Sequence, residues 1–323
     1  MALRALLVSL LAGLASAAAP AQSIDYPSRA VRIIVPLAAG GNVDIVARTV
    51  AEQIGKTLGQ PVLVENRPGA SSLVGTQFVA KAAADGYTLL AIANTFATVP
   101  LIVPNPGYDP LRDFAGVTLT CLVPQVLVVN PALSAHSVRE LIALAKSEPG
   151  KISYASSGNG STGHMAAELF NRQAGIRMLH VPYKGNSQAL IDVIGGQVAM
   201  MFDQVSTSAP QIKAGNVRAL AVTSLVRSPL LPEVPTVDES GVEGYEDITF
   251  NGLVAPAGTP HEILVRLNRA VAGAVGEPDL YKRFIERGIE LKASGSPEEF
   301  GAYIKAESEK KGRLSREAGI KPE

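Results

Sequence analysis

A short stretch rich in glycine and hydroxyl side chains, residues 156–164 (SSGNGSTGH), is the part of this sequence best suited to bind a ligand. It lies between a predicted strand, 151–155, and a predicted helix, 163–175. Glycines let the backbone turn its N–H groups toward a ligand, and the first turn of a helix adds free N–H donors at the positive end of its dipole. The stretch therefore predicts an anion-binding site.

The donors of this loop are uncharged: they are the hydroxyls of Ser156, Ser157, Ser161 and Thr162 and the amide of Asn159. A triphosphate would more naturally meet Lys, Arg or a metal ion, whereas a carboxylate fits neutral donors well. A second uncharged glycine-rich loop, 37–42 (LAAGGN), precedes another predicted helix, 43–58. Two such loops from different domains could hold one small acid between them.

Gly158, Gly160 and Gly163 also match the GxGxxG pattern of dinucleotide-binding loops. That interpretation requires an acidic residue near the end of the next strand, and the segment 179–184 (LHVPYK) contains none. The GxxxxGK(S/T) pattern of phosphate-binding loops is absent from the sequence. An ordinary glycine-rich turn without a ligand remains the alternative interpretation of this segment.

Asp203 and Tyr183 lie near the ends of predicted strands, where α/β sheets bind their ligands. Asp203 either receives a ligand hydroxyl or amine, or caps the helix that follows it. Tyr183 either lines the cleft or belongs to an ordinary turn. His164, at the start of a helix, is expected to orient the loop rather than to act as a general base.

Little in the sequence indicates catalysis. The GxSxG pattern of hydrolases is absent, and the histidines lie in no motif that pairs them with a nucleophile. Residue order alone does not exclude a Ser-His-Asp arrangement, so an exported esterase-like hydrolase stays open as an alternative. The single cysteine, Cys121, cannot form an intramolecular disulfide and is expected to be a small buried side chain. No Cys/His cluster has zinc-ligand spacing, and we expect neither a metal nor another cofactor.

The chain has 323 residues, of which 47% are hydrophobic and 18% charged, a composition typical of a folded protein with two domains. Its 29 basic residues balance 29 acidic ones, and without a basic stripe nucleic-acid binding is disfavoured.

Residues 1–21 combine Arg4, an apolar run and a small-residue site that ends at Ala21. This pattern predicts an export signal, cleaved near Ala21, and a mature protein in the periplasm; an N-terminal membrane helix is the alternative.

Short apolar runs alternate with amphipathic patterns along the chain, which predicts an α/β fold with doubly wound sheets covered by helices on both faces. Two extended apolar runs, 118–129 and 248–256, fit no single strand-helix unit and are interpreted as crossings between two domains. The predicted division gives domain 1, residues 22–123 plus 251–323, and an inserted domain 2, residues 124–250.

The order of motifs along the predicted mature chain resembles a known family. The segments that carry the resemblance are YP at 26–27, VP at 35–36 with GG at 40–41, VENRPGA at 64–70, DGYTL at 85–89, YAS at 154–156, VPYKG at 181–185, GGQV at 195–198, RALAVT at 218–223 and LVAPAGTP at 253–260. They are similar to the extracytoplasmic substrate-binding proteins of tripartite tricarboxylate transporters, the Bug type.

The resemblance implies a two-domain Venus-flytrap fold, like that of type II periplasmic binding proteins, with the ligand cleft between the domains. It implies that a small organic acid binds there and passes to integral membrane transporter subunits. In the family, the loops corresponding to 37–41 and 156–162 hold a ligand carboxylate, and Asp203 matches a position that can face the other end of the ligand. The expected ligand contacts are Leu37, Ala39, Gly40, Thr95, Ser156, Ser157, Asn159, Gly160, Ser161, Thr162, His164, Tyr183 and Asp203.

Two departures from the family bear on the ligand. The usual P-F-x-P-G-G reads PLAAGG at 36–41, and Phe96 stands where the family commonly has His. The loss of a polar side chain at Phe96 suggests a less polar or aromatic ligand portion. We expect a monomer that binds a solute and catalyses no reaction. A sensor module that hands its ligand to a membrane kinase is a further alternative, which the sequence does not separate from transport.

Overall fold

The computed structural model of the protein describes residues 25–317 and residue 319, so the predicted export signal, 1–21, lies outside the described residues. The strands are β1 (Val31–Val35), β2 (Val62–Asn66), β3 (Thr88–Ala93), β4 (Phe114–Val129), β5 (Ser153–Ser156), β6 (Leu179–Pro182), β7 (Met200–Gln204), β8 (Arg218–Val222), β9 (Ile248–Pro256) and β10 (Glu290–Leu291). The helices are α1 (Asn42–Leu58), the 3-10 helix η1 (Ala70–Ser72), α2 (Leu73–Ala80), α3 (Thr95–Ile102), α4 (Val138–Ser147), α5 (Thr162–Ala174), α6 (Asn186–Ile194), α7 (Val205–Lys213), α8 (His261–Val275), α9 (Pro278–Ile285) and α10 (Pro297–Glu317).

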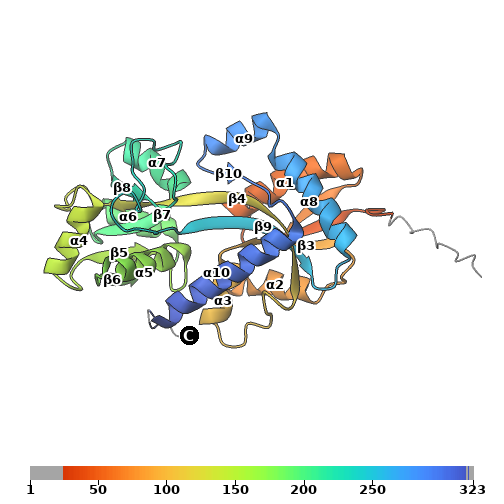
Figure 1. Ribbon diagram of the computed structural model, residues 1–323, viewed down its shortest axis with the longest axis horizontal. Helices are drawn as coiled ribbons and strands as arrows, with labels where there is room; N and C mark the ends of the chain where they lie inside the picture. Colours follow the sequence, from red (N-terminus) through yellow and green to blue (C-terminus); the bar gives the residue numbers. More distant parts are fainter. Residues whose placement is uncertain (1–24, 318, 320–323) are drawn as a thin grey trace, which may run out of the picture.

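The described strands form one mixed sheet with the order β2-β1-β3-β9-β4-β7-β5-β6, and β8 and β10 pair with β4. β1 is parallel to β2 and β3, and β5 is parallel to β6 and β7, whereas β4 and β9 run antiparallel to their neighbours. We call lobe 1 the half that contains β1, β2, β3, β9 and β10, and lobe 2 the half that contains β5, β6, β7 and β8. Figure 1 shows lobe 1 on the right and lobe 2 on the left, with β4 running through both.

The 16-residue strand β4 joins the two lobes. It pairs with β9 as far as Pro124, and from Gln125 onward it pairs with β7 and β8. Successive side chains of a strand point to opposite faces, so alternate residues share a face. Cys121 and Val123 enter the core of lobe 1, and Leu127 enters the core of lobe 2. Gln125 lies between them on the same face, at the point where β4 passes from one lobe to the other.

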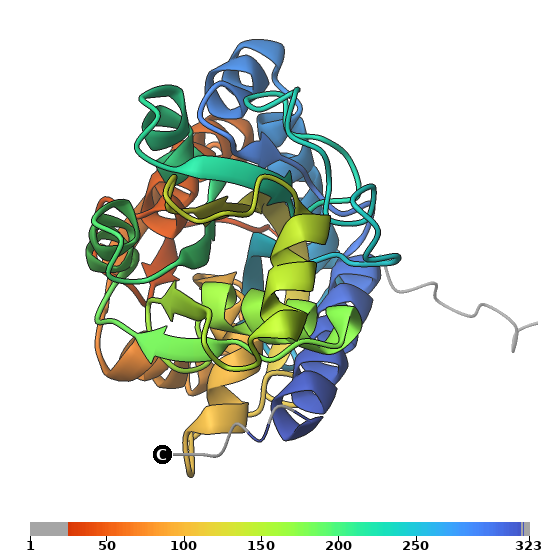
Figure 2. The same ribbon diagram turned by 90° about the vertical axis from the view of Figure 1, so that its left-hand side faces the viewer.

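Helices cover both faces of each lobe because their apolar side chains recur with helical spacing. In α1, for example, Val43, Val46, Val50 and Ile54 are buried along one side. α1, α8 and α9 pack on one face of lobe 1, and α2, α3 and α10 cover the other. In lobe 2, α4 and α5 cover one face, and α6 and α7 cover the opposite face, as Figure 2 shows with lobe 2 toward the viewer.

The 21-residue helix α10 contacts both lobes. Phe300 belongs to the core of lobe 1, and Leu314 belongs to the core of lobe 2. Between these contacts, the Lys311 ammonium donates to Asp247 Oδ2 at 2.5 Å, and both side chains are buried. Figure 1 shows α10 lying obliquely across the sheet, so this helix is a second physical connection between the lobes.

The predicted α/β fold is confirmed, but its strand directions differ from the expectation of parallel sheets. The central strands β4 and β9 are antiparallel because they connect the lobes instead of following a helical crossover. Helix α3 is not among the predicted elements, since Pro100 lies inside it and proline usually ends a helix. The domain boundaries given above stay a prediction. Among the described helices, none is both long and apolar enough to cross a membrane.

Candidate ligand site between the lobes

The two lobes touch where the predicted ligand loops lie. Asn42, the first residue of α1, donates from Nδ2 to Oε1 of Gln204 at the end of β7, at 2.6 Å. Gly160 lies against the end of α3, because a Cβ at this glycine would be 2.4 Å from Ile102 Cδ1. Its φ of +69° also favours glycine. The loops that follow β1 and β5 are therefore close to the contact between the lobes.

The first loop is shaped by Asp44, a buried carboxylate in the first turn of α1. Asp44 accepts hydrogen bonds from the Gly40 N–H at 2.9 Å, from Asn66 Nδ2 at 2.9 Å and from Arg48 Nε at 3.1 Å. Burial alone would raise the pKa of Asp44, but the donors from Arg48, Gly40 and Asn66 outweigh it and hold this pKa below its usual value. Gly40 therefore donates its N–H to the protein itself.

The remaining predicted residues of the first loop differ in exposure. Leu37 is half-buried and packs against the core of lobe 1, and its carbonyl accepts a hydrogen bond from Asn66 Nδ2 at 3.1 Å. Ala39 and Gly41 are exposed. Gly41 occupies the N-cap position of α1 without a capping side chain, so the N–H groups of the first turn are not satisfied by such a cap.

The second loop is held mainly by its own residues. The Gly158 N–H donates to Ser156 Oγ at 3.1 Å, and the Gly160 N–H donates to His164 Nδ1 at 3.0 Å. Ser161 is the N-cap of α5 and accepts from the His164 N–H at 3.4 Å. The expectation that glycine N–H groups point toward a ligand is therefore wrong for Gly158 and Gly160, because both serve to fix the loop.

Ser157 and Thr162 are only half-buried, and no side-chain hydrogen bond within the loop is described for either of them. Thr162 and Gly163 begin α5, where backbone N–H groups precede the first intrahelical hydrogen bonds. Asn159 is exposed. The donors that this loop presents outward are thus hydroxyls and the first turn of a helix, not the glycines.

Beneath the loop, His164 and His180 form a stacked pair of imidazole rings. Their centroids are 3.9 Å apart, and the ring of Tyr154 lies near both, with its centroid 4.9 Å from that of His180 and 6.3 Å from that of His164. Burial lowers the pKa of His164 to about 3, with a further contribution from His180, and burial lowers the pKa of His180 to about 4. Both rings are therefore neutral at neutral pH. The position of His164 agrees with the interpretation of this residue as one that orients the loop.

Ser156 and His180 lie at a distance that would suit a nucleophile and its base. Ser156 Oγ is 2.7 Å from His180 Nε2. Ser156 is fully buried, however, and its Oγ also accepts the Gly158 N–H. An esterase needs a serine that a substrate can reach, so this pair is better described as a support of the loop.

The carboxylate of Asp203 is completely buried and surrounded by donors from its own lobe. Asn186 Nδ2 donates to Oδ1 at 2.8 Å, while Thr207 Oγ1 and Ser208 Oγ donate to Oδ2 at 2.5 and 2.7 Å. Burial raises the pKa of Asp203, and the hydrogen bonds from Thr207, Ser208 and Asn186 offset only part of this effect. These contacts tie Asp203 to α6 and to the first turn of α7, although Gln204 and not Asp203 is the N-cap of α7. They favour a structural role over direct contact with a ligand.

Tyr183 likewise directs its hydroxyl group into lobe 2. Its oxygen lies 2.7 Å from Asp192 Oδ2, to which it donates. Burial and this acceptor raise the pKa of Tyr183 to about 12. The ring is only half-buried and packs against the lobe 2 core, so Tyr183 contributes shape rather than a free hydroxyl.

At the end of β3, Asn94 and Thr95 lie beside β9. Asn94 donates from Nδ2 to the Ile248 carbonyl at 3.1 Å and accepts the Phe250 N–H at 2.8 Å, which fixes the strand end. Thr95, half-buried, begins α3. Phe96 is 2% exposed, and its ring packs against Tyr108 and Phe114 in the lobe 1 core. The suggestion that Phe96 faces a less polar ligand portion therefore loses its support.

Three polar residues on the connecting strands were not expected from the sequence. Gln125 on β4 and Thr249 and Asn251 on β9 are 1%, 5% and 3% exposed. Gln125 Nε2, Thr249 Oγ1 and Asn251 Nδ2 have no hydrogen-bond partner in the described part of the chain. Their signal in the sequence is a polar side chain inside an otherwise apolar strand, which patterns of strand hydrophobicity do not emphasise.

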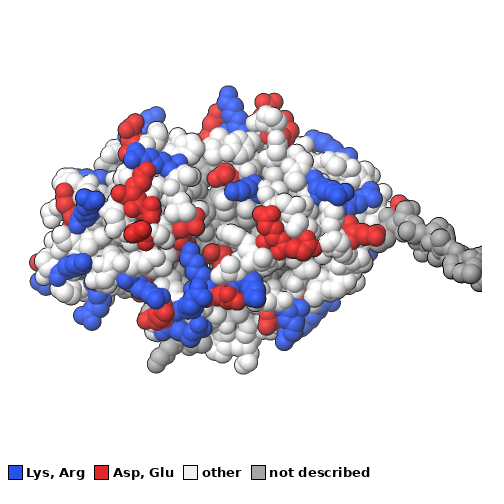
Figure 3. Space-filling view, viewed as in Figure 1, with Lys and Arg blue, Asp and Glu red and all other residues white. Residues whose placement is uncertain are grey.

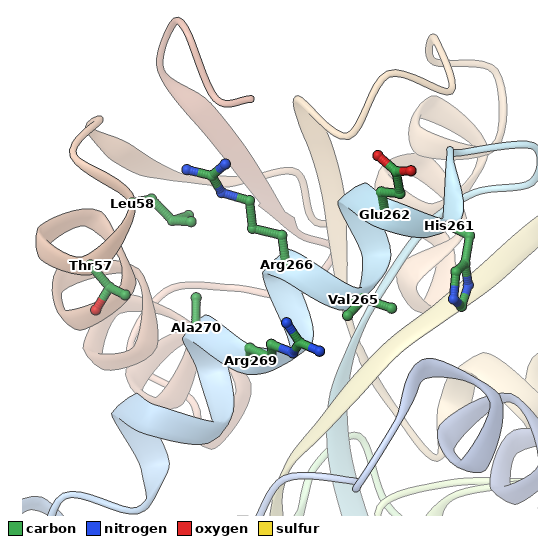
Figure 4. Close-up of a pocket in the computed structure, with 8 residues that line it drawn as sticks. All are labelled: Thr57, Leu58, His261, Glu262, Val265, Arg266, Arg269 and Ala270. Atoms are coloured by element: carbon green, nitrogen blue, oxygen red, sulfur yellow. The ribbon is translucent and has the colours of Figure 1, made fainter. Parts of the chain in front are cut away.

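Cavities lie beside and away from this site. One of about 780 Å³ adjoins the Asn42–Gln204 contact, between α1, α7 and the turn after α9. Another, of about 510 Å³, lies between α1 and α8 on lobe 1. Figure 4 shows Arg266 and Arg269 of this second cavity extending in different directions, so they do not converge on one ligand.

On the face drawn in Figure 3, acidic and basic side chains are interspersed rather than gathered by sign. Among the described residues, no group of three or more His, Cys, Asp or Glu side chains is placed to hold a metal ion. Cys121 is buried, as expected, and burial raises its pKa to about 12.

Two α/β lobes joined by one long strand, with uncharged glycine-rich loops at their contact, define a two-lobed solute-binding protein. The model of a family described as the tripartite tricarboxylate transporter family receptor matches residues 46–320, and the chain belongs to this family. The resemblance drawn from the motifs is thereby confirmed. The family comprises periplasmic solute-binding proteins, for which binding rather than catalysis is the shared activity.

Relatives with similar sequences cover nearly the whole chain. A UPF0065 protein in the tcbD-tcbE intergenic region of a Pseudomonas species is 38% identical, over 95% of this chain and 92% of its own length. Protein BugT of Bordetella pertussis is 36% identical, over 95% of this chain and 94% of its own length.

Solved structures agree in fold. R. palustris Rpa4515 with adipate is 37% identical with a TM-score of 0.79, and the match covers 92% of this chain and 100% of that one. MatC from Rhodopseudomonas palustris with bound malate is 32% identical with a TM-score of 0.74, over 90% of this chain and 99% of that one.

Proposed function

We propose that this protein captures a small organic acid between its lobes and delivers it to the integral membrane subunits of a tripartite tricarboxylate-type transporter. The observation that carries the proposal is the placement of two uncharged, glycine-rich loops and the helices α1 and α5 that follow them at the contact between lobes. Helix N-termini and hydroxyls suit a carboxylate because they supply hydrogen-bond donors without a fixed positive charge. Adipate and malate in the two similar structures support this class of ligand.

In this proposal the candidate residues divide into two groups. Thr95, Ser157, Asn159 and Thr162, together with the backbone of residues 37–41, face the ligand. A second set supports these groups from behind: Ser156, Gly160, Ser161, His164, Tyr183 and Asp203. The side chains of the first set are assigned by their exposure, since each is exposed or half-buried. The members of the second set are assigned by their hydrogen bonds, since each directs a polar atom to a neighbour within the protein.

The proposal has further parts. We place the chain in the periplasm as a monomer, after cleavage near Ala21, and without a cofactor. We divide it into domains at 22–123 plus 251–323 and at 124–250, with the strands β4 and β9 as the hinge. We also propose that it is not an enzyme, since the Ser156–His180 pair is buried within the loop.

Ligand screening tests the central claim. We expect one or more acids from a panel of mono-, di- and tricarboxylates to raise the melting temperature of the mature chain and to give a binding isotherm in calorimetry. Ser157→Ala should weaken that binding about tenfold, the equivalent of about 1.4 kcal/mol for a charge-assisted hydrogen bond. Ser147→Ala, at the exposed end of α4, is the matched control and should leave affinity unchanged.

A panel in which no acid binds would contradict the proposed function. Turnover of a model ester that Ser161→Ala or Ser157→Ala abolishes would instead support a hydrolase. Pull-down of a membrane kinase in place of the permease subunits, from membranes containing both, would support the sensor alternative.

A further inference from the structure

The connecting strands β4 and β9 carry three polar side chains that the protein does not satisfy, and we call this group the floor. Gln125, Thr249 and Asn251 are each more than nine-tenths buried, and each has a side-chain atom without a partner among the described residues. Buried amides elsewhere in lobe 1 are paired: Asn268 Nδ2 donates to the carbonyls of Val117 and Ser294 at 3.2 and 3.0 Å. Unpaired buried donors are uncommon because they lose water without gaining a replacement.

These three residues share one face of the connecting strands. In the register of β4 and β9, Thr249 is opposite Val123, and Asn251 is opposite Cys121. Gln125 follows Val123 by two residues, so it is the diagonal neighbour of Thr249. Residues directly opposite each other in antiparallel strands lie about 5 Å apart at Cβ, and diagonal neighbours about 7–8 Å apart. The unpaired atoms thus form a row along the hinge.

This face is the one that α1 and α5 cover. Cys121 and Val123 pack with α1 in the lobe 1 core, and Leu127 packs with α5 in the lobe 2 core. A Cβ at Gly163, in the first turn of α5, would lie 3.8 Å from Gln125 Oε1. Gln125 therefore lies between the two helices whose preceding loops form the proposed site.

The neighbours of Asn251 place the end of β3 beside the same row. Asn251 is opposite Ala93, the last residue of β3, two positions before Thr95. The Asn251 side chain also lies beside the Cys121 thiol, whose pKa is raised by burial and lowered by the N–H groups of Asn251. Sulfur is a weak acceptor, so this contact leaves the amide available to a stronger one.

From this arrangement we propose that Gln125, Thr249 and Asn251 bind the end of the ligand that the two loops do not hold. Their free groups are two amide N–H donors and a hydroxyl, so the ligand group must accept hydrogen bonds, as a carboxylate, carbonyl or hydroxyl oxygen does. The ligand is accordingly an acid with a second acceptor, not a simple alkyl or aromatic monoacid. This inference rests on the proposed function.

The position of the row also links recognition to closure. Gln125 is on the strand that joins the lobes, while Thr249 and Asn251 are on the strand that returns to lobe 1. A ligand that bridges the loops and this floor contacts both lobes and both strands. Acids that lack the second acceptor reach the loops but leave the floor unpaired, and they bind more weakly for that reason.

Pairs of acids of equal chain length test the inference. We expect adipate to bind more tightly than hexanoate, and succinate more tightly than butyrate, by at least tenfold in at least one pair. Gln125→Met, which keeps the size of the side chain and removes the amide, should reduce that preference at least tenfold. Its melting temperature should stay level or rise, because an unpaired buried amide is replaced by an apolar group.

Asn268→Leu is the matched control, because it removes a buried amide that is fully paired. It should lower the melting temperature and leave the preference between acids unchanged. Thr249→Val provides an independent, nearly isosteric variant should Gln125→Met fail to fold, and it should reduce the preference by at least threefold.

The outcomes separate this inference from the proposed function. Two results would overturn the inference while the proposed function stands: wild-type protein binds monoacids as tightly as the matched diacids, or the folded variants keep the full preference for diacids. In either case the floor does not contact the second acceptor of the ligand. If wild-type protein binds no acid of either kind, the proposed function fails, and this inference fails with it.

Discussion

The imidazole rings of His164 and His180 stack with centroids 3.9 Å apart and planes inclined by only 6°. His164 belongs to the first turn of α5, and His180 belongs to β6, so the contact joins the candidate ligand loop, 156–164, to the strand beside β5. His164 Nδ1 accepts the Gly160 N–H, and a proton on this nitrogen would break that hydrogen bond. Two positive charges at this separation would also repel each other.

We expect protonation of this pair to destabilise the protein in mild acid. Burial lowers the pKa of His164 to about 3 and that of His180 to about 4, below the value of about 6.5 in an unfolded chain. The unfolded chain therefore binds more protons between pH 6.5 and 4, and stability falls as the pH falls through this window, by up to about 1.4 kcal/mol per pH unit for His164.

Chemical denaturation at pH 7, 6 and 5 measures this slope. His164→Gln should make the slope shallower by the uptake of one proton, with the exposed His136→Gln as the matched control. An identical slope in wild-type protein and His164→Gln would contradict the prediction.

Gly160→Ala should weaken both folding and binding. The backbone conformation of this glycine costs an alanine about 1–2 kcal/mol, and the new Cβ would collide with Ile102 of the other lobe. Gly175 also has a positive φ, of 62°, but a Cβ at that glycine would have no other atom within 4 Å. Gly175→Ala should therefore lose a similar amount of stability, measured by denaturation, while its ligand affinity, measured by calorimetry, stays unchanged. Equal ligand affinities for the two variants would count against a role for the Gly160–Ile102 contact.

Lys311→Met should be strongly destabilising. It leaves the buried Asp247 carboxylate without its cation, a change that costs about 3–5 kcal/mol. The double variant Lys311→Met with Asp247→Leu should recover most of this loss, because neither charge then remains. Lys56→Met serves as control, since its partner Glu52 is exposed and such pairs contribute less than about 1 kcal/mol. Urea denaturation measures the free energy of unfolding of these variants. A similar loss of stability for Lys311→Met and Lys56→Met would contradict the importance of the buried ion pair.

Asp203→Asn distinguishes a structural role of this carboxylate from a ligand contact. An amide cannot accept from Asn186, Thr207 and Ser208 as the carboxylate does, so the variant should lose about 1–3 kcal/mol of stability. If Asp203 only holds the start of α7 through Thr207 and Ser208, acids with and without an amino group should keep the same relative affinity. A selective loss of the amino acids would show that Asp203 contacts the ligand.

The sequence predicts the positions of the loops well, because strand, glycine loop and helix follow one another in the local pattern. It does not predict the direction of the donors. Whether the Gly160 N–H points outward or toward His164 depends on where the imidazole lies, and His180 comes from a strand 16 residues later in the chain. Local patterns carry no information on such a contact.

The central strands show the same limit at a larger scale. The run that contains Gln125 is recognised as an unusual segment because it is long and apolar. Its antiparallel pairing with β9 and β7, however, depends on partners more than 70 residues away in sequence. The sequence therefore does not predict the polar floor, because only the pairing of these strands places Gln125, Thr249 and Asn251 on one face.

The unbroken course of β4 through both lobes has a mechanical consequence. A flexible linker would let the halves swing freely, whereas a hydrogen-bonded ribbon stores elastic energy when it twists and returns it when released. The energy needed to change the angle between the lobes should therefore be set by the resistance of this strand to twisting and bending. Substitutions that weaken its hydrogen bonds should broaden the range of interlobe angles without altering the structure of either lobe.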